Sequence, residues 1–143
     1  MVLVVVEKHS SITLCAASSG IASLLLIGGC TAHSHFEISL QLFENSTCGM
    51  SNGTLAQIIQ AANAIIWDEV SMQHCHAPEV ADCTLCDVCD INCPFGGITV
   101  IFGGDCQQIL PAIIKGICAQ IVGACICSSA LWQDIAPNIF HLH

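Results

Sequence analysis

Four cysteines lie close together in the second half of the chain, at a spacing that could bind a metal cluster. They are Cys83, Cys86, Cys89 and Cys93, and with Pro94 they reproduce the C-x2-C-x2-C-x3-C-P spacing of iron–sulfur ferredoxins. A cluster of that type needs a loop that wraps around it, whereas this segment has helical periodicity and its cysteines fall on the side of the carboxylates. We therefore keep an iron–sulfur cluster as the alternative, and favour four thiols on a solvated helix face.

Zinc is a related alternative, because histidines and a further cysteine precede this run. His74, Cys75 and His76 could join Cys83 and Cys86 in a site of nitrogen and sulfur ligands. Chance clustering is the simpler interpretation in a chain with twelve cysteines, and we prefer it.

Two adjacent carboxylates suggest a different chemistry. The apolar run Ala64–Trp67 ends on Asp68 and Glu69. In nucleotide hydrolases, one acid at a strand end holds Mg²⁺ through water, and its neighbour orients and deprotonates the attacking water. The alternative is that both acids cap the helix that follows.

A second apolar run, Ile98–Phe102, ends in glycines. Gly103–Asp105 follows it, and Gln108 comes shortly after. Glycines after a buried strand let the backbone approach a ligand closely, and a glutamine amide can hydrogen-bond a phosphate oxygen or a water. An ordinary strand-to-helix turn would have the same composition.

Alternating strands and helices must position these side chains. The sequence predicts strands at Ile12–Ala17, Ala64–Trp67 and Ile98–Phe102, with Asn138–Leu142 as a candidate fourth strand. It predicts helices at Ile21–Ile27, Leu55–Ala62 and Ala77–Asn92, and polar loops at Thr31–Phe36 and Glu44–Thr54. The fold class expected is α/β, with a mostly parallel sheet flanked by helices. The continuous apolar character of Ala64–Trp67 predicts burial on both of its faces.

The last of these helices has two distinct faces. Its apolar face comprises Ala77, Val80, Ala81, Leu85, Val88 and Ile91. The opposite face carries Glu79, Asp82, Asp90 and the four cysteines. This pattern predicts a helix that packs one side against the sheet.

Composition excludes several classes of protein. A chain of 143 residues is long enough for one domain with its own core, and a hydrophobic content of 54% excludes intrinsic disorder. Eleven acidic residues stand against two lysines and no arginine, and a net charge of −9 opposes binding to nucleic acid or anionic membrane. The uncharged run Ile12–Ala32 is too rich in Ser, Thr and Gly for a membrane span, and the chain has no convincing export signal.

Five blocks, read in order, resemble a known family. They are Ala17–Ser23, Gly28–Ser34, Ile66–Glu69, Pro94–Gly97 and Gly103–Pro111. Their order and spacing resemble those of the Pif-one-type ATP-dependent DNA helicases, most closely those carried by Helitron transposons, over nearly the whole chain from about Ile12. The resemblance implies part of a RecA-like (P-loop NTPase) motor domain that hydrolyses ATP to move along single-stranded DNA and unwind duplexes. It also implies an intracellular, nuclear protein of the kind that acts in DNA repair, recombination and telomere maintenance.

The resemblance assigns roles to individual residues. It makes Asp68 the Mg²⁺ ligand through water, Glu69 the general base and Gln108 the sensor of the terminal phosphate, with Asp105 also in the nucleotide site. Ser19, Gly20, Thr31 and His33 would lie in or near the path of single-stranded DNA. The cofactors implied are ATP and Mg²⁺, and the partner is single-stranded DNA.

The sequence also departs from this family. The glycine-rich phosphate loop with its Gly-Lys-Thr/Ser, expected before Ile12, does not occur, and the second motor domain would begin after His143. We therefore expect residues 1–143 to be a single partial motor domain, with no ATPase activity of its own.

The missing arginines are a second departure. Related helicases usually carry Arg at the positions of Cys30, His35, Cys83, Cys86, Gln107 and Cys118. One C-to-T change on either DNA strand turns an Arg codon that begins CG into a Cys, His or Gln codon. Our hypothesis is that the sequence descends from a decayed transposon copy, and that several of its cysteines replaced arginines.

Overall fold

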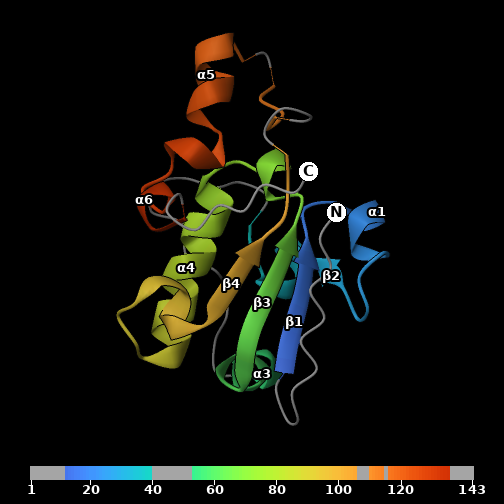
Figure 1. Ribbon diagram of the computed structural model, residues 1–143, viewed down its shortest axis with the longest axis vertical. Coiled ribbons are helices and arrows are strands. Elements are labelled where there is room, and N and C mark those ends of the chain that lie inside the picture. Colours follow the sequence, from blue (N-terminus) through green and yellow to red (C-terminus); the bar gives the residue numbers. More distant parts are fainter. Residues whose placement is uncertain (1–11, 40–52, 106–109, 115, 136–143) are drawn as a thin grey trace.

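The computed structural model describes residues 12–39, 53–105, 110–114 and 116–135 (Figure 1). Within them, four strands form one sheet in the order β2-β1-β3-β4. The strands are β1 (Ile12–Ala17), β2 (Cys30–Thr31), β3 (Ala62–Asp68) and β4 (Thr99–Phe102). All the strand pairs in this sheet are parallel, which confirms the predicted α/β class.

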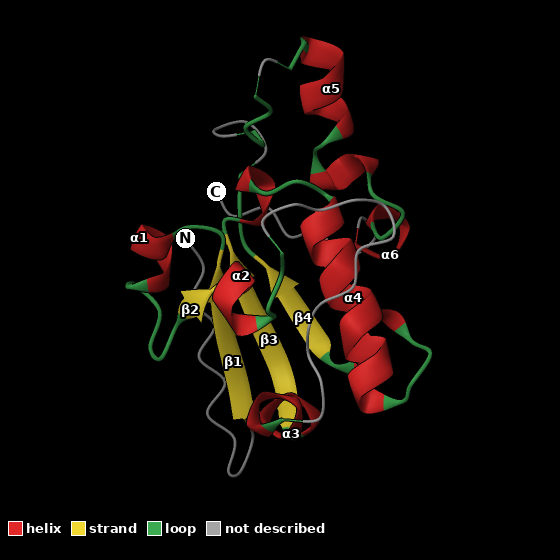
Figure 2. Cartoon of the chain, turned by 180° about the vertical axis from the view of Figure 1, so that it is seen from behind, coloured by secondary structure: helices red, strands yellow, loops and turns green. Residues whose placement is uncertain are grey.

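The helices of the described residues are short, apart from one. They are α1 (Gly20–Ser23), α2 (Ala32–His35), α3 (Thr54–Gln60), α4 (His76–Cys89), α5 (Cys118–Gly123) and α6 (Trp132–Ile135). Short 3₁₀ turns occur at η1 (Val70–Met72), η2 (Pro94–Gly97) and η3 (Ile126–Ser128). Seen from behind, α2 and α3 lie in front of the sheet and α4 runs beside β4 (Figure 2).

The main hydrophobic core fills the space between these helices and one face of the sheet. Leu14 pairs with Ile65, and Ile65 with Val100, so the inward side chains of neighbouring strands stand side by side. Phe36, which follows α2, stacks on Trp67 of β3 with ring centroids 5.2 Å apart, and both side chains are at most 1% exposed. Burial of these large rings contributes much of the stability of the core.

The opposite face of the sheet is less covered, so the prediction that β3 is buried on both faces is wrong. Ile66 is half-buried and Ile101 is 42% exposed. On this side, Ala17 of β1 packs with Ala22 and Leu26 in a small cluster around α1. Such limited covering leaves the outer side chains of β3 and β4 partly in solvent.

Helix α4 confirms the predicted amphipathic pattern. Ala77, Ala81 and Leu85 are at most 1% exposed and face the core. The helix stops at Cys89, three residues earlier than predicted, because Asp90 adopts the left-handed conformation (φ 54°) that commonly ends helices. Ile91 therefore lies beyond the helix and is 46% exposed.

The predicted helix at Ile21–Ile27 is much shorter in the structure. Ser19 caps α1 with a side-chain oxygen that accepts from the N–H of Ala22, but the helix ends at Ser23 and tighter turns follow. The reason is the lack of an apolar stripe facing the core. The side chains of Ile21, Leu24, Leu25 and Ile27 are 80%, 85%, 68% and 89% exposed.

The predicted polar loop at Thr31–Phe36 is wrong. Thr31 pairs with Ala17 in β2 and then caps α2, since its side-chain oxygen accepts from the N–H of Ser34. Ala32 and Phe36 are fully buried and anchor this helix in the core. The candidate strand Asn138–Leu142 and nearly all of the loop Glu44–Thr54 lie outside the described residues, and Thr54 begins α3.

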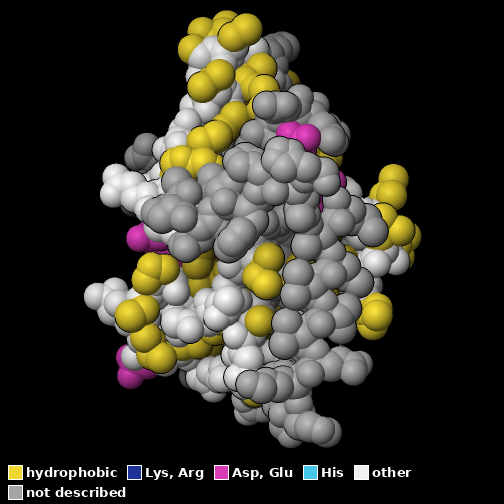
Figure 3. Space-filling view, in the orientation of Figure 1, with side chains coloured by type: hydrophobic (Ala, Val, Ile, Leu, Met, Phe, Trp, Pro, Cys, Tyr) yellow, Lys and Arg dark blue, Asp and Glu magenta, His cyan; other side chains and the backbone are white. Residues whose placement is uncertain are grey.

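The surface of the described residues is apolar in places and lacks Lys and Arg, because Lys8 and Lys115 fall outside them. Hydrophobic side chains gather over α1 and α5 (Figure 3). None of the helices in the described residues is both long and apolar enough to cross a bilayer.

Candidate functional site

The carboxyl ends of β1, β3 and β4 meet at one edge of the sheet around Asp68. The backbone N–H of Ser18 donates to the carbonyl of Asp68 at 3.0 Å, and the N–H of Gly103 donates to the carbonyl of Trp67 at 2.8 Å. In turn, the N–H of Val70 donates to the carbonyl of Gly103 at 2.9 Å. The loops after three strands are thus joined at the edge where open parallel sheets bind ligands.

Glu69 turns the chain sharply at this edge. It has left-handed backbone angles (φ 56°, ψ 35°), which cost a residue with a side chain about 1–3 kcal/mol. The side chain of Asp68 supports the turn, because its Oδ1 accepts from the N–H of Glu69 at 3.0 Å. Both acids are half-buried, so their carboxylates stand at the sheet edge with access to solvent.

The glycines after β4 are required by close approach to this turn. A Cβ added at Gly103 would lie 2.7 Å from Oδ1 of Asp68, and one added at Gly104 would lie 3.0 Å from Oγ of Ser71. Gly104 also has φ of +154°, which side chains disfavour. Asp105 follows and is exposed, whereas Gln108 lies outside the described residues.

The four residues expected near a DNA strand lie around the carboxyl ends of β1 and β2. Ser19 and Thr31 cap α1 and α2, so both have a structural role in addition to any contact with a ligand. Gly20 is exposed, and no atom lies within 4 Å of where its Cβ would be. His33 is hydrogen-bonded through Nδ1 to Nε2 of Gln73 at 3.2 Å, which ties α2 to the segment after the acids.

Three residues that we did not single out from the sequence also shape this edge. Ser18 donates from Oγ to the carbonyl of Asp68 and accepts from Nε1 of Trp67, each at 3.3 Å. Ser71 and Gln73 are 3% and 7% exposed, and Oγ of Ser71 and Oε1 of Gln73 have no hydrogen-bond partner among the described residues. In the sequence, Ser18 lies inside the block Ala17–Ser23, and Ser71 and Gln73 follow the two acids closely.

The cysteine run does not form a metal centre in the structure. Cys86 donates from Sγ to the carbonyl of Cys93 at 3.0 Å, Cys89 packs against Gly96, and Cys83 is exposed. Partial desolvation of its sulfur, with a contribution from neighbouring acids, raises the pKa of the Cys83 thiol. Among the described residues, the side chains whose metal-ligating atoms converge are His74, Cys75 and His76, without the cysteines of the run.

Comparison with known proteins identifies the family. The sequence model of the PIF1-like helicases matches residues 1–143. The chain belongs to the PIF1-like helicase family. This confirms the resemblance that the five sequence blocks indicated.

Solved PIF1-like structures share the fold. The Pif1 helicase from Bacteroides in complex with ADP-AlF3 and ssDNA is 26% identical, with a TM-score of 0.75 over 88% of this chain and 30% of that one. Unliganded Pif1 from Bacteroides sp is 25% identical, with a TM-score of 0.73 over 87% of this chain and 30% of that one. Pif1 helicase from Candida albicans is 26% identical, with a TM-score of 0.62 over 85% of this chain and 27% of that one.

The sheet and its helices therefore form a RecA-like motor-domain fold, as expected. The chain spans less than a third of the length of these three helicases. A comparison with curated protein sequences gave no match.

Proposed function

We propose that this chain is part of the first motor domain of an ATP-dependent DNA helicase, which couples ATP hydrolysis to movement along single-stranded DNA and duplex unwinding. The observation that carries the proposal is the pair Asp68 and Glu69 at the carboxyl edge of β3, in a chain of the PIF1-like family. The Bacteroides relative was solved with ADP-AlF3 and ssDNA, which supports ATP and single-stranded DNA as the ligands.

The chemistry of the acids fits a magnesium nucleotide. Carboxylate oxygens are the ligands that Mg²⁺ prefers, and Mg²⁺ bound there would neutralise charge on the phosphates. Asp68 would hold the ion through water, while Glu69 would orient the attacking water and accept its proton. Asp105 and Gln108 would complete the contacts to the nucleotide, and Gln108 would sense the terminal phosphate.

The DNA path proposed for Ser19, Gly20, Thr31 and His33 lies beside the nucleotide site. The bonds between Ser18 and Asp68, and between His33 and Gln73, connect the two regions directly. Because the described surface has no Lys or Arg, phosphate contacts would depend on hydroxyl and backbone N–H groups. We expect DNA binding by this chain to be weak or absent at physiological salt. The location proposed for the protein is the nucleus.

The 143 residues contain no Gly-Lys-Thr or Gly-Lys-Ser phosphate loop, so we propose that they are a partial motor domain that does not turn over ATP unaided. The first test is ATP hydrolysis by the purified chain with Mg²⁺ and single-stranded DNA, where we expect none. Turnover that disappears in Glu69→Gln would contradict this expectation.

A chimera tests the positive part of the proposal. Residues 12–135 would replace the matching segment of an intact PIF1-like helicase, and DNA-stimulated ATPase activity would be measured. We expect Glu69→Gln to lower the turnover of an active chimera by about 10²–10⁴-fold, as the loss of a general base does. Asp87→Asn, which changes an exposed acid of α4, is the matched control and should leave turnover unchanged. Equal turnover with and without Glu69→Gln would refute the role of Glu69.

A further inference from the structure

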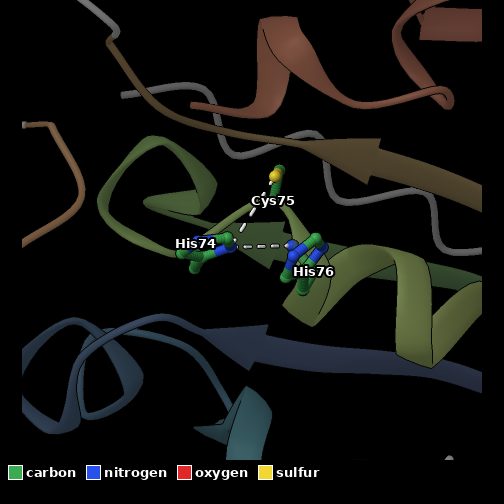
Figure 4. A group of neighbouring side chains, drawn as sticks. All are labelled: His74, Cys75 and His76. Carbon is green, nitrogen blue, oxygen red and sulfur yellow. Dashed lines mark hydrogen bonds between the residues drawn. The ribbon is translucent and has the colours of Figure 1, made fainter. Parts of the chain in front are cut away.

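Three metal-ligating side chains converge where the chain enters α4. They belong to His74, Cys75 and His76, and one ligand atom from each lies within 4.8 Å of the others. Figure 4 shows the imidazole of His74 next to the thiol of Cys75, with Nδ1 and Sγ 3.7 Å apart. The rings of His74 and His76 have centroids 4.4 Å apart. Nitrogen and thiolate sulfur are the ligands that Zn²⁺ prefers over the oxygen ligands that suit Mg²⁺.

Hydrogen bonds of the backbone fix the positions of these three residues. The N–H of Cys75 donates to the carbonyl of Ala124 at 2.8 Å, so the start of α4 is tied to the end of α5. The N–H of His76 donates to Nδ1 of His74 at 3.2 Å, which orients that ring. Cys75 is 4% exposed, whereas both histidines are half-buried, so an ion could reach the sulfur past the imidazoles.

A carboxylate supports the group from the first turn of α4. Oε2 of Glu79 lies 2.8 Å from Nδ1 of His76, an arrangement that fixes ligating histidines in many zinc sites and leaves Nε2 available. The hydroxyl of Ser129 donates to Oε1 of Glu79 at 2.6 Å and holds the carboxylate in place. Burial alone would raise the pKa of Glu79, but the hydrogen bonds from Ser129 and His76 outweigh it and lower that pKa.

The local charge also suits a divalent cation. One thiolate and the Glu79 carboxylate would balance its two positive charges, and the described residues include no Lys or Arg to oppose it. Cys75 is the N-cap of the 14-residue helix α4, whose positive dipole end favours a thiolate, whereas burial and the charge of Glu79 raise the pKa of this thiol, so a bound cation would have to displace its proton.

We propose that His74, Cys75 and His76 form a binding site for a divalent transition ion of the zinc class, with a fourth position open to water. The site differs from the zinc site considered from the sequence, because Cys83 and Cys86 take no part. Its nitrogen and sulfur ligands also differ from the carboxylates of Asp68 and Glu69. The metal site therefore does not depend on the proposed helicase function.

The test is titration of the reduced, metal-free chain with Co²⁺ and then Zn²⁺, without nucleotide or DNA. Co²⁺ reports its ligands, because a bound thiolate gives a charge-transfer absorption that Zn²⁺ removes on displacing it. We expect this absorption in the wild type, its loss in Cys75→Ser, and its retention in the matched double variant Cys83→Ser/Cys86→Ser. Retention in Cys75→Ser, or loss in the double variant, would overturn the proposal.

Two further variants keep the test informative if Cys75→Ser fails to fold, which circular dichroism would show. Glu79→Gln should weaken Zn²⁺ binding by about 10–100-fold, as changes beside a ligating histidine do. His76→Ala, which removes a half-buried ligand, should weaken it by at least as much. Unchanged Zn²⁺ affinity in both folded variants would show that the ion binds elsewhere.

Discussion

Two glycine-to-alanine changes should differ in their cost to stability, although each adds one methyl group. At Gly96, φ is +61°, and an added Cβ would lie 2.5 Å from the carbonyl oxygen of Leu85 and 2.9 Å from Cβ of Cys89. Both neighbours belong to α4 and cannot move aside easily. At Gly103, the added Cβ would meet Oδ1 of Asp68 at 2.7 Å, and that atom ends a side chain that can rotate if it gives up its hydrogen bond with the N–H of Glu69.

The magnitudes follow from these contacts. For Gly96→Ala, the left-handed backbone costs about 1–2 kcal/mol and overpacking about 1–3 kcal/mol. The smaller entropy of the unfolded chain offsets about 0.4–1 kcal/mol of this, which leaves a net loss of about 1–4.5 kcal/mol. For Gly103→Ala, rotation of the Asp68 carboxylate costs about 0.5–1.5 kcal/mol, loss of its hydrogen bond with Glu69 costs about 0.5–1.5 kcal/mol, and the same entropy gain leaves a net loss of about 0–2.5 kcal/mol.

Urea unfolding followed by the fluorescence of Trp67, which is 1% exposed, measures both changes. With a slope of about 2 kcal/mol per molar urea, Gly96→Ala should lower the midpoint by about 0.5–2 M, while Gly103→Ala should lower it by less, at most about 1.3 M. A wild-type midpoint for Gly96→Ala, or an equal loss in both variants, would refute the reasoning from these contacts.

Three further tests concern the core, one half-buried histidine and the arginine hypothesis. Phe36→Ala should cost about 3–5 kcal/mol of unfolding free energy because Phe36 is fully buried, whereas Ile27→Ala, at an 89% exposed position, should cost less than about 0.5 kcal/mol in the same urea assay. Burial lowers the pKa of His35 in the folded state, so the unfolded state binds more protons and stability should fall as the pH drops below about 6.5. The urea midpoint should therefore fall from pH 7.5 to 5.5 by less in His35→Gln than in the wild type, and an equal fall would contradict this. Cys83→Arg, at an exposed site on α4, should change stability by less than about 0.5 kcal/mol, whereas Ala81→Arg on the buried face should prevent cooperative unfolding.

The long elements could be predicted from the sequence because their periodicity is strong. β1 has the predicted bounds, β3 contains and β4 nearly matches its predicted run, and the apolar face of α4 was correct except for Ile91, which lies beyond the helix. Helix α2 was missed because its start is set by a local hydrogen bond from the N–H of Ser34 to the Thr31 side chain, and threonine is equally common in loops. The start of α1 was predicted within one residue, but its end was placed too late. Where the apolar residues of the next turn have no core to pack against, a prediction from apolar residues alone makes the helix too long.

The acids of the candidate site were found from the sequence, but their surroundings were not. Asp68 and Glu69 follow an apolar strand, which is a local pattern. The hydrogen bonds of Ser18 to Asp68 and of His33 to Gln73 join residues 50 and 40 positions apart, and a single sequence gives no measure of such pairings. Gln108 remains a prediction from the family resemblance.

The arginine hypothesis also stays a prediction. Cys30, Cys83 and Cys118 are exposed, as positions that once carried arginine would be, whereas Cys86 and His35 are half-buried and Gln107 lies outside the described residues. The gene and its intact relatives would test it directly, and arginine codons of the AGA type at these positions in the relatives would count against it.

The exposed side chains of α1 affect how the chain behaves in concentrated solution. Ile21, Leu24, Leu25 and Ile27 form an apolar surface on a molecule with a net charge of −9. At low ionic strength, mutual repulsion keeps copies apart, but at about 0.1 M salt the screening length shrinks to about 10 Å and short-range apolar attraction is no longer opposed. Added salt should therefore promote self-association of this chain, so low-salt buffers are the conditions in which a monomer can be studied.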